Sequence, residues 1–354
     1  MRSANALQHT LAEHGQVLFG TQVSPEALVL TTVAKDTRAI FRVRKAGSGS
    51  PPLIAKTRSP GRSGDRELMA AETEWEFGVH SAVWHSLQAA GSPLYRVPKP
   101  LLLVAEQGLI VMEEASGEPV VRSLWREGFG LTRHVANDDR IRGCGEWLRA
   151  FAARAPRLTL PEAPPRIAET LAANRSRHHV YSLIGRSGQE LADAVVANAV
   201  RRLEAYRVDR FLASRIEKGL TRSFDAFGGG ADIQGNVHGK YSIADVVSGA
   251  GHTTAIDLEQ AGYGSLYLDA AYFLFQIAMV MRWRPLGRRS RPAELRQVFL
   301  SARWPEREFD ERLLEAFIAY YLVNSLRPGG QLPGFTARLS ARAWLERWLS
   351  RVGV

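Results

Sequence analysis

Cysteine is almost absent from this chain: Cys144 is the only one among 354 residues. Because a disulfide needs two cysteines, a scaffold stapled by disulfides within the chain is excluded. A single thiol is typical of proteins that work in a reducing compartment, so we expect a cytoplasmic protein.

Long hydrophobic runs are missing as well. The longest predominantly apolar stretch, Ala270 to Met281, has about 12 residues, whereas a membrane-spanning helix needs roughly 20. We therefore expect a buried core helix there and no membrane span. The segment from Met1 to Gly20 places Glu13 among its apolar residues, which is unlike a signal peptide.

Long blocks of one charge sign are also absent. Hydrophobic residues make up 45% and charged residues 23% of the chain, which is typical of a globular protein and excludes overall disorder. Lys and Arg exceed Asp and Glu by 46 to 36, a net charge of +10. A basic surface favours anionic partners such as nucleotides. No recognised nucleic-acid motif accompanies this charge, so we do not expect a nucleic-acid partner.

Short segments rich in branched and aromatic residues follow Gly20. Polar turns separate the first three, which predict an antiparallel meander over Ala27–Val33, Ala39–Arg44 and Leu53–Lys56. Leu68, Trp75, Val79 and Ala82 then recur at helical spacing as one apolar stripe, which predicts a helix from Arg66 to Ala90. Two further strands are predicted at Lys99–Ala105 and Leu109–Met112.

Beyond Gly117 the chain becomes mainly helical. Apolar spacing predicts helices at Arg140–Arg154, in several pieces between Arg166 and Arg222, at Leu268–Met281 and over the last part of the chain. A β-like passage from Asn236 to Ile256 interrupts them. We therefore expect an α+β chain with two domains, residues 1–115 and 116–354.

Carboxylates gather around the β-like passage. Two strands separated by the Ser248–Gly251 turn place Asp245 and Asp257 at adjacent ends of a hairpin. Convergent carboxylates are the oxygen ligands that Mg²⁺ takes together with substrate phosphates. The residues alone therefore predict a magnesium site at Asp245 and Asp257.

In their order, these segments resemble the aminoglycoside phosphotransferase and choline kinase family. The family's loop His-Gly-Asp-(Phe/Leu)-x-x-x-Asn is matched by His238, Gly239 and Tyr241. Its metal segment, Ile-Asp-(Trp/Phe)-Glu, is similar to residues 256–259, and its Gly-Asp-Pro-x-x-Asp-Leu-Ala segment is similar to residues 264–271. The order of strands and helices agrees over nearly the whole chain.

The resemblance implies a bilobal, protein-kinase-like fold. Its N-terminal lobe has a five-stranded antiparallel sheet and a helix and binds nucleotide; its larger, mainly helical C-terminal lobe carries the catalytic loop and the acceptor site. The implied activity is the ATP- and Mg²⁺-dependent transfer of a phosphoryl group to a hydroxyl of a small molecule. Because the chain is basic, we expect a neutral or anionic sugar, nucleoside or lipid headgroup as acceptor.

On the nucleotide side, the resemblance gives Lys56 the role of the strand lysine that holds the phosphates. A glutamate of the following helix would pair with it. Glu72, Glu74 and Glu76 are the candidates, and we favour Glu74 because the sequence Glu74-Trp-Glu-Phe77 echoes the family pattern.

The resemblance also implies roles for backbone groups and carboxylates. Met112, Glu113 and Ala115 would form the hinge that meets adenine, although the turn from Thr32 to Ile40 lacks the glycine that protein kinases use to cover the phosphates. Asp257 would be the main metal ligand and Asp245 the second. His238 would be a structural residue of the loop, and Asp269 would brace that loop from the core helix.

Two positions depart from the family pattern. Lys240 stands where the family has its catalytic Asp, and Asp245 stands where it has a metal-binding Asn. A lysine with an ordinary pKa of about 10.4 is charged at neutral pH and cannot accept a proton. Lys240 is then an anion contact, a partner of Asp245, or a base with a lowered pKa.

These departures leave three functions open. The first is a phosphotransferase, which the retention of both metal-site carboxylates favours. The second is a pseudokinase, a nucleotide- or partner-binding module without transfer activity, and the third is a kinase-fold enzyme with another reaction, such as nucleotidyl transfer. The basic run from Arg282 to Arg291 is a candidate anion-binding loop for the acceptor.

Overall fold

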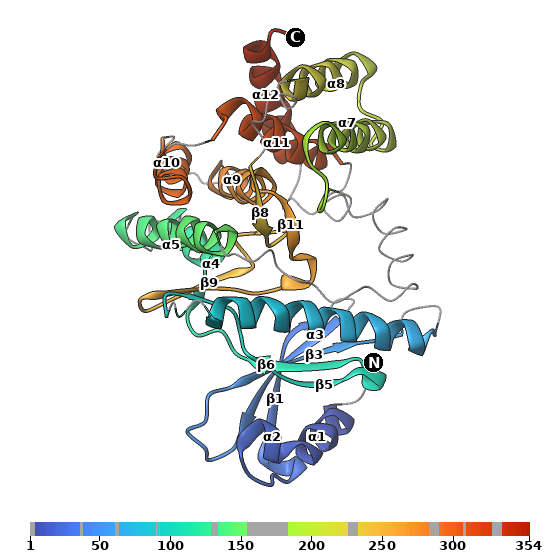
Figure 1. Ribbon diagram of the computed structural model, residues 1–354, viewed down its shortest axis with the longest axis vertical. Helices are drawn as coiled ribbons and strands as arrows, with labels where there is room; N and C mark the ends of the chain where they lie inside the picture. Colours follow the sequence, from blue (N-terminus) through green and yellow to red (C-terminus); the bar gives the residue numbers. More distant parts are fainter. Residues whose placement is uncertain are drawn as a thin grey trace. The chain divides into compact units, whose positions relative to one another are not determined.

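The computed structural model (Figure 1) describes residues 4–35, 38–60, 64–89, 91, 93–128, 134–153, 183–225, 233–282, 290–306, 309–327 and 335–354. They form two compact units. The N-terminal unit runs to Ser116 and also includes Thr254–Glu259. The C-terminal unit holds the described residues from Gly117 to Thr253 and from Gln260 onward. Asp257 therefore belongs to the N-terminal unit although it lies far along the chain.

The N-terminal unit is built on the predicted antiparallel sheet. Its strands are β1 (Leu28–Lys35), β2 (Arg38–Lys45), β3 (Leu53–Arg58), β5 (Pro100–Val104) and β6 (Leu109–Glu113). They lie side by side in the order β1-β2-β3-β6-β5, and each neighbouring pair is antiparallel. This confirms the α+β class and the five-stranded sheet. A two-residue strand, β4 (Tyr95–Arg96), precedes β5.

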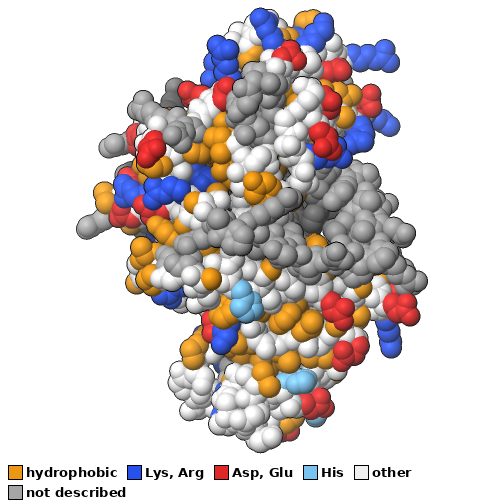
Figure 2. Space-filling view, in the orientation of Figure 1, with side chains coloured by type: hydrophobic (Ala, Val, Ile, Leu, Met, Phe, Trp, Pro, Cys, Tyr) orange, Lys and Arg blue, Asp and Glu red, His pale blue; other side chains and the backbone are white. Residues whose placement is uncertain are grey.

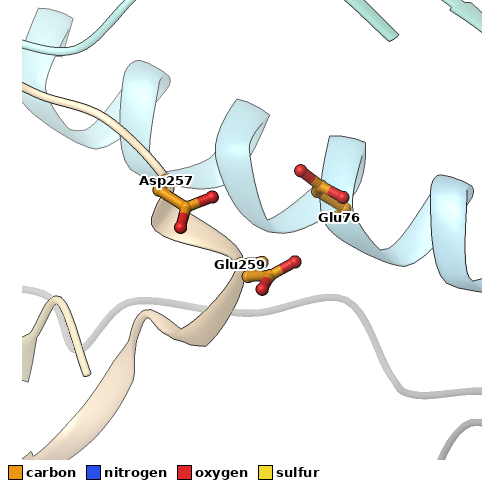
Figure 3. Close-up of side chains that lie close together, drawn as sticks. All are labelled: Glu76, Asp257 and Glu259. Carbon is orange, nitrogen blue, oxygen red and sulfur yellow. The ribbon is translucent and has the colours of Figure 1, made fainter. Parts of the chain in front are cut away.

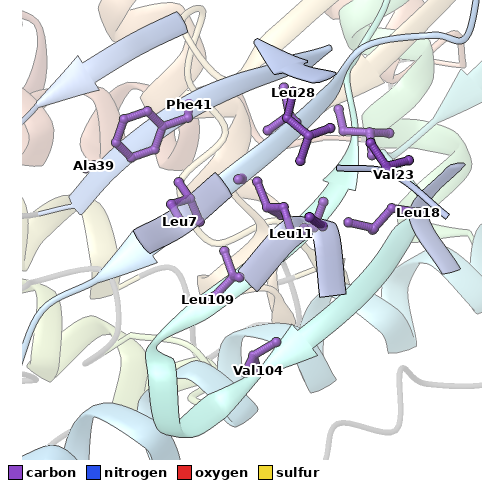
Figure 4. Packing of buried hydrophobic residues seen from close by; sticks show 14 residues of the cluster. Leu7, Leu11, Leu18, Val23, Leu28, Ala39, Phe41, Val104 and Leu109 are labelled. Atoms are coloured by element: carbon purple, nitrogen blue, oxygen red, sulfur yellow. The ribbon is translucent and has the colours of Figure 1, made fainter. Parts of the chain in front are cut away.

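Successive residues of β3 point to opposite faces of the sheet. Leu53 and Ala55 join a buried apolar cluster with the N-terminal helices α1 (Ala4–Glu13) and α2 (Gly15–Phe19) (Figure 4). Lys56 and Arg58 reach side chains of α3 (Arg66–Ala89) instead. Helices α1 and α2 were not predicted from the sequence, and their apolar residues bury the sheet face that α3 leaves uncovered.

The buried stripe of α3 fixes which of its residues meet the sheet. Its buried residues recur at helical spacing: Met69, Thr73, Glu76, Val79, His80, Val83 and Leu87. Glu76 and His80 thus lie on a mostly apolar face. Burying an ionised group is costly unless it is paired, so this stripe points to a partner for Glu76 on the sheet.

The C-terminal unit is mainly helical, as predicted. Its helices are α4 (Val120–Gly128), α5 (His134–Ala152), α7 (Gly188–Ala205), α8 (Arg210–Phe224), α9 (Tyr267–Arg282), α10 (Arg291–Arg303), α11 (Glu311–Val323) and α12 (Phe335–Val352). Helix α9 is the predicted core helix, and it packs against α10 and α11 with residues such as Leu268, Phe273 and Ile277 almost fully buried.

Short β-strands, joined by loops, lie between the helices of this unit. β8 (Gln234–Val237) pairs with β11 (Gly262–Ser265), and β7 (Glu118–Pro119) pairs with β9 (Val246–Gly249). β10 (His252–Ala255) follows β9 after the predicted turn, and its last two residues already belong to the N-terminal unit. The β-like passage of the sequence therefore consists of β8, β9 and β10.

Two further expectations concern membrane-spanning helices and the basic surface. None of the helices that the structure describes has the length and hydropathy that crossing a membrane requires. On the face shown in Figure 2, Lys and Arg side chains lie among Asp and Glu side chains. The net positive charge is thus interspersed with acidic groups on that face.

Candidate functional site

The N-terminal unit places a lysine between two carboxylates. Lys56 Nζ donates to Glu76 Oε1 of α3 at 3.0 Å and to Asp257 Oδ1 at 3.0 Å. The side chains of Lys56 and Glu76 are only 14% and 8% exposed. A partly desolvated ion pair of this kind holds the lysine at one position.

The prediction that Glu74 pairs with Lys56 is wrong, because Glu76 is the partner. Glu74 is exposed, two residues away on the helix and therefore on a different face. The predicted apolar stripe of this helix included Leu68 and Trp75, which are only half-buried. In the buried stripe, Glu76 lies seven residues from an apolar residue on either side. This spacing is the sequence signal that identifies Glu76.

A second cation, which the sequence analysis missed, lies on the same strand. Arg58 pairs with Glu72 through Nη1, and its Nη2 lies 3.0 Å from Glu76 Oε2 and 3.8 Å from Glu259 Oε2. Because Arg58 follows Lys56 by two residues in β3, both side chains emerge on the face toward α3. The sequence signal was the Lys-Thr-Arg alternation at the end of the strand.

Three carboxylates of this cluster face one another. Figure 3 shows Glu76 on α3 and Asp257 and Glu259 on the segment after β10, with their side chains directed toward a common point. One oxygen of each lies within 4.8 Å of the others. Asp257 has a φ of 63°, in the left-handed region that costs a non-glycine residue about 1 kcal/mol or more. Such strain is typical of functional positions.

This donor set fits a hard divalent cation. Carboxylate oxygens are the ligands that Mg²⁺ prefers, and it is usually held by one or two of them together with phosphates. Glu76 offers one oxygen to Lys56 and the other to Arg58. Asp257 and Glu259 are therefore the better-placed ligands in this unit. Asp245 lies in the C-terminal unit, so its role as second ligand stays a prediction.

His80 lies one helical turn after Glu76 and is 4% exposed. Its Nε2–H donates to the carbonyl of Pro98 at 2.7 Å, which requires a proton on that nitrogen. Burial lowers the His80 pKa to about 4, and the nearby Lys56 lowers it too, against the opposing effects of the Pro98 hydrogen bond and of Glu76 and Asp257. The folded protein therefore holds His80 neutral at physiological pH.

This neutral histidine gives a prediction for stability. The unfolded chain binds a proton below its ordinary pKa near 6.5 while the folded state resists until about 4, so stability falls as the pH drops through that window. His80→Gln keeps a donor for Pro98 and does not titrate. We expect its unfolding free energy to fall between pH 7.5 and pH 5 by about 2 kcal/mol less than that of the wild type. Urea unfolding at both pH values checks this, and parallel pH profiles would show that His80 is not the titrating group.

The predicted hinge follows β6. The backbone N–H of Glu113 donates to Lys99 O at 3.0 Å, and that of Glu114 donates to Pro52 O at 3.2 Å. Met112 is buried in the sheet opposite Ile54. Of the three predicted hinge residues, Ala115 is the one whose N–H has no partner in the part of the chain that the structure describes. The Glu113 N–H is engaged within the protein and is a poor choice for adenine.

In the C-terminal unit, a buried aspartate holds the loop that begins at His238. Asp269 Oδ2 accepts the His238 N–H at 2.6 Å, and Oδ1 accepts the Tyr241 N–H at 3.2 Å. Burial raises the pKa of Asp269, although His238 and these hydrogen bonds oppose it. Between the two N–H groups, Gly239 has a φ of 88°, and a Cβ there would lie 2.2 Å from Gln260 O. The loop therefore requires glycine at this position.

His238 is fully buried and does not meet solvent. Its ring lies edge-on to Trp147 and Tyr241, and the Tyr241 hydroxyl donates to Cys144 O at 3.2 Å. A histidine enclosed by aromatic rings is placed to support the loop rather than to exchange protons with a substrate. This geometry agrees with the structural role that the resemblance implies.

One face of helix α9 contacts the loop that begins at His238. Asp269 and Gln276 lie on this face, and Gln276 Oε1 accepts the Ile243 N–H at 3.1 Å. Tyr272 lies between them at helical spacing. Burial raises the pKa of Tyr272, with Lys240 acting in the opposite direction and Asp245 in the same one. Both departures from the family pattern are therefore close enough to the Tyr272 hydroxyl for their charges to act on it.

Only part of the basic run from Arg282 to Arg291 lies in the described residues. Residues 283–289, with Arg284, Arg288 and Arg289, lie outside the described residues. Arg291 is 4% exposed and pairs with Glu127 Oε1 at 2.6 Å and Asp138 Oδ1 at 2.7 Å. Arg291 is thus a buried structural cation, and its assignment to an anion-binding loop is wrong.

Comparisons with known proteins bear on the fold. No protein-family model and no curated protein matches the sequence. Among solved structures, a thermostable variant of aminoglycoside phosphotransferase APH(4)-Ia in complex with ADP and hygromycin B is 14% identical, with a TM-score of 0.54 over 98% of this chain and 99% of that one.

Two other solved structures have different acceptors in their names. Macrolide 2'-phosphotransferase MphH from Brachybacterium faecium is 14% identical, with a TM-score of 0.54 over 96% of this chain and 98% of that one. Ethanolamine kinase from Plasmodium vivax is 11% identical, with a TM-score of 0.53 over 97% and 88%. The resemblance inferred from the sequence is thereby confirmed at the level of the fold: this chain has the kinase-like fold of the aminoglycoside phosphotransferase and choline kinase-like proteins.

Proposed function

We propose that this protein is an ATP- and Mg²⁺-dependent phosphotransferase that acts on a hydroxyl of a small molecule. The observation that carries the proposal is Lys56, held between Glu76 and Asp257 at 3.0 Å from each. Solved proteins of this fold hold ADP or AMP-PNP. A fixed ammonium beside a metal-binding carboxylate is the arrangement that receives a nucleotide polyphosphate.

The chain's own residues divide the work. Lys56 binds the phosphates, and Ala115 offers its backbone N–H to the purine. Asp257 and Glu259 hold the metal ion, with Asp245 as a further candidate, and the bound ion neutralises charge on the phosphates. Position 240 carries no carboxylate that could accept the acceptor's proton, so in this proposal the proton passes to an oxygen of the transferred phosphoryl group, and Lys240 neutralises the charge of that group.

Acceptor binding falls to the C-terminal unit in this proposal. Lys240 and Asp245 belong to the loop that Asp269 and Gln276 of α9 hold through backbone N–H groups, so an acceptor bound at this loop would meet charges of both signs. We propose a neutral or anionic sugar, nucleoside or lipid headgroup, because the chain as a whole is basic.

A second candidate, a pseudokinase, is favoured by one observation, the lysine at position 240. Both candidates bind nucleotide, so turnover separates them. The experiment measures ADP release from ATP and Mg²⁺ with a panel of sugars, nucleosides and lipid headgroups, for wild type and for Asp257→Asn. Acceptor-dependent ADP release that Asp257→Asn lowers at least about 100-fold supports the phosphotransferase. Nucleotide binding without turnover on any acceptor supports the pseudokinase.

A further inference from the structure

Arg58 is held more firmly than an ordinary surface arginine. Its backbone N–H donates to Gly108 O at 2.7 Å, and its side chain is 18% exposed. Gly108 adopts a φ of 63°, and a Cβ on it would lie 2.5 Å from Arg58 O. The end of β3 is therefore fixed in place at Arg58 by a close backbone contact.

The guanidinium joins two elements that Lys56 also joins. It binds Glu72 and Glu76 on α3 and approaches Glu259 on the segment after β10. Lys56 binds Glu76 on α3 and Asp257 on that same segment. Glu76 is shared, with Oε1 on Lys56 and Oε2 on Arg58, so Arg58 limits how far this carboxylate can turn away from Lys56.

Charge gives Arg58 a second effect. Two cations and four carboxylates meet in this cluster, which leaves it a net charge of −2 when all six groups are ionised. Without Arg58 the net charge would be −3. A more negative cluster attracts a bare divalent cation more strongly and repels the phosphates of a nucleotide more strongly.

We propose that Arg58 is a positioning residue of the nucleotide site that makes the site prefer a metal–nucleotide complex over a metal ion alone. It orients Glu76, and through Glu76 it orients Lys56, while it offsets the charge of Glu259. This inference rests on the proposed function, because it concerns the same site. A lysine at position 58 keeps the charge but lacks the planar fork that reaches several carboxylates at once.

The test uses the full chain with two titrations, Mn²⁺ alone and AMP-PNP at saturating Mg²⁺. For Arg58→Gln we expect the Kd of Mn²⁺ to fall about tenfold and the Kd of AMP-PNP to rise about tenfold, because one positive charge has left the cluster. Arg58→Lys should show both shifts, but smaller ones. If Arg58→Gln does not fold, Arg58→Lys replaces it in the test. Arg44→Gln, which removes an exposed arginine from β2, should leave both constants unchanged.

The two opposed shifts distinguish positioning from a merely structural role. A general loosening of the site would weaken both ligands together, and that result would overturn the inference, as would unchanged constants in Arg58→Gln. If the wild type binds Mn²⁺ but not AMP-PNP, the proposed function itself fails, and the inference falls with it.

Discussion

Lys56→Met is expected to lower kcat/KM for ATP by about 100- to 1000-fold, which is the usual effect of removing one group that stabilises charge in a transition state. It also leaves Glu76 and Asp257 without the cation that both contact at 3.0 Å. Because Arg58 still neutralises Glu76, we expect a loss of stability of about 2–3 kcal/mol, less than the roughly 3–5 kcal/mol of a fully broken buried pair.

Lys218→Met on α8 is the matched control for this change. Lys218 is exposed, and substituting it removes the same charge from the C-terminal unit. Its kinetics and its urea midpoint should match those of the wild type. A Lys56→Met enzyme with an unchanged kcat/KM for ATP would contradict the role of the lysine even if its stability fell as expected.

The second large effect concerns Lys240, where the chain departs from the family pattern. A protonated lysine that neutralises the transferring phosphoryl group acts in the transition state more than in the bound state. Lys240→Ala is therefore expected to lower kcat by more than about tenfold, or about 1.4 kcal/mol of barrier, with little change in KM for ATP. Steady-state kinetics at saturating acceptor measure both constants. A Lys240→Ala enzyme with the wild-type kcat would defeat this assignment.

Restoring the family's residues separates a weakened loop from an altered one. The double variant Lys240→Asp with Asp245→Asn places the usual carboxylate and amide in the loop. If Lys240 has its own catalytic role, the double variant loses activity, as we expect. A gain in phosphotransfer would mean that the wild-type loop is a weakened form of the usual one.

Much of the fold follows from local sequence pattern. The β-strands at Leu53–Arg58 and Leu109–Glu113 were predicted within one or two residues, because short runs of branched residues between polar turns are typical of strands. Helix α3 was predicted within one residue at its C-terminal end. The resemblance to the family also implied that Asp269 braces the loop at His238, and Asp269 does accept the N–H groups of His238 and Tyr241.

What the sequence analysis missed depends on contacts between distant segments. The choice among three glutamates rests on the phase of α3, and two residues of phase error exchange an exposed Glu74 for a buried Glu76. Arg58 was not among the predicted site residues, because its partners, Glu72 and Glu259, come from a helix and from a segment far along the chain. The pattern of residues within a short stretch of sequence does not show which distant side chains will form such pairs.

We propose that Lys56, Glu76 and Asp257 form a site for a magnesium–nucleotide complex. The melting temperature of the wild type and of Asp257→Ala, with and without millimolar Mg²⁺-ATP, tests this site. A ligand at 100 times its Kd stabilises the folded state by about 2.7 kcal/mol, so the wild type should melt several degrees higher with Mg²⁺-ATP, and Asp257→Ala should lose most of that shift. A folded wild-type protein whose melting temperature does not change with Mg²⁺-ATP would show that these residues do not bind the complex.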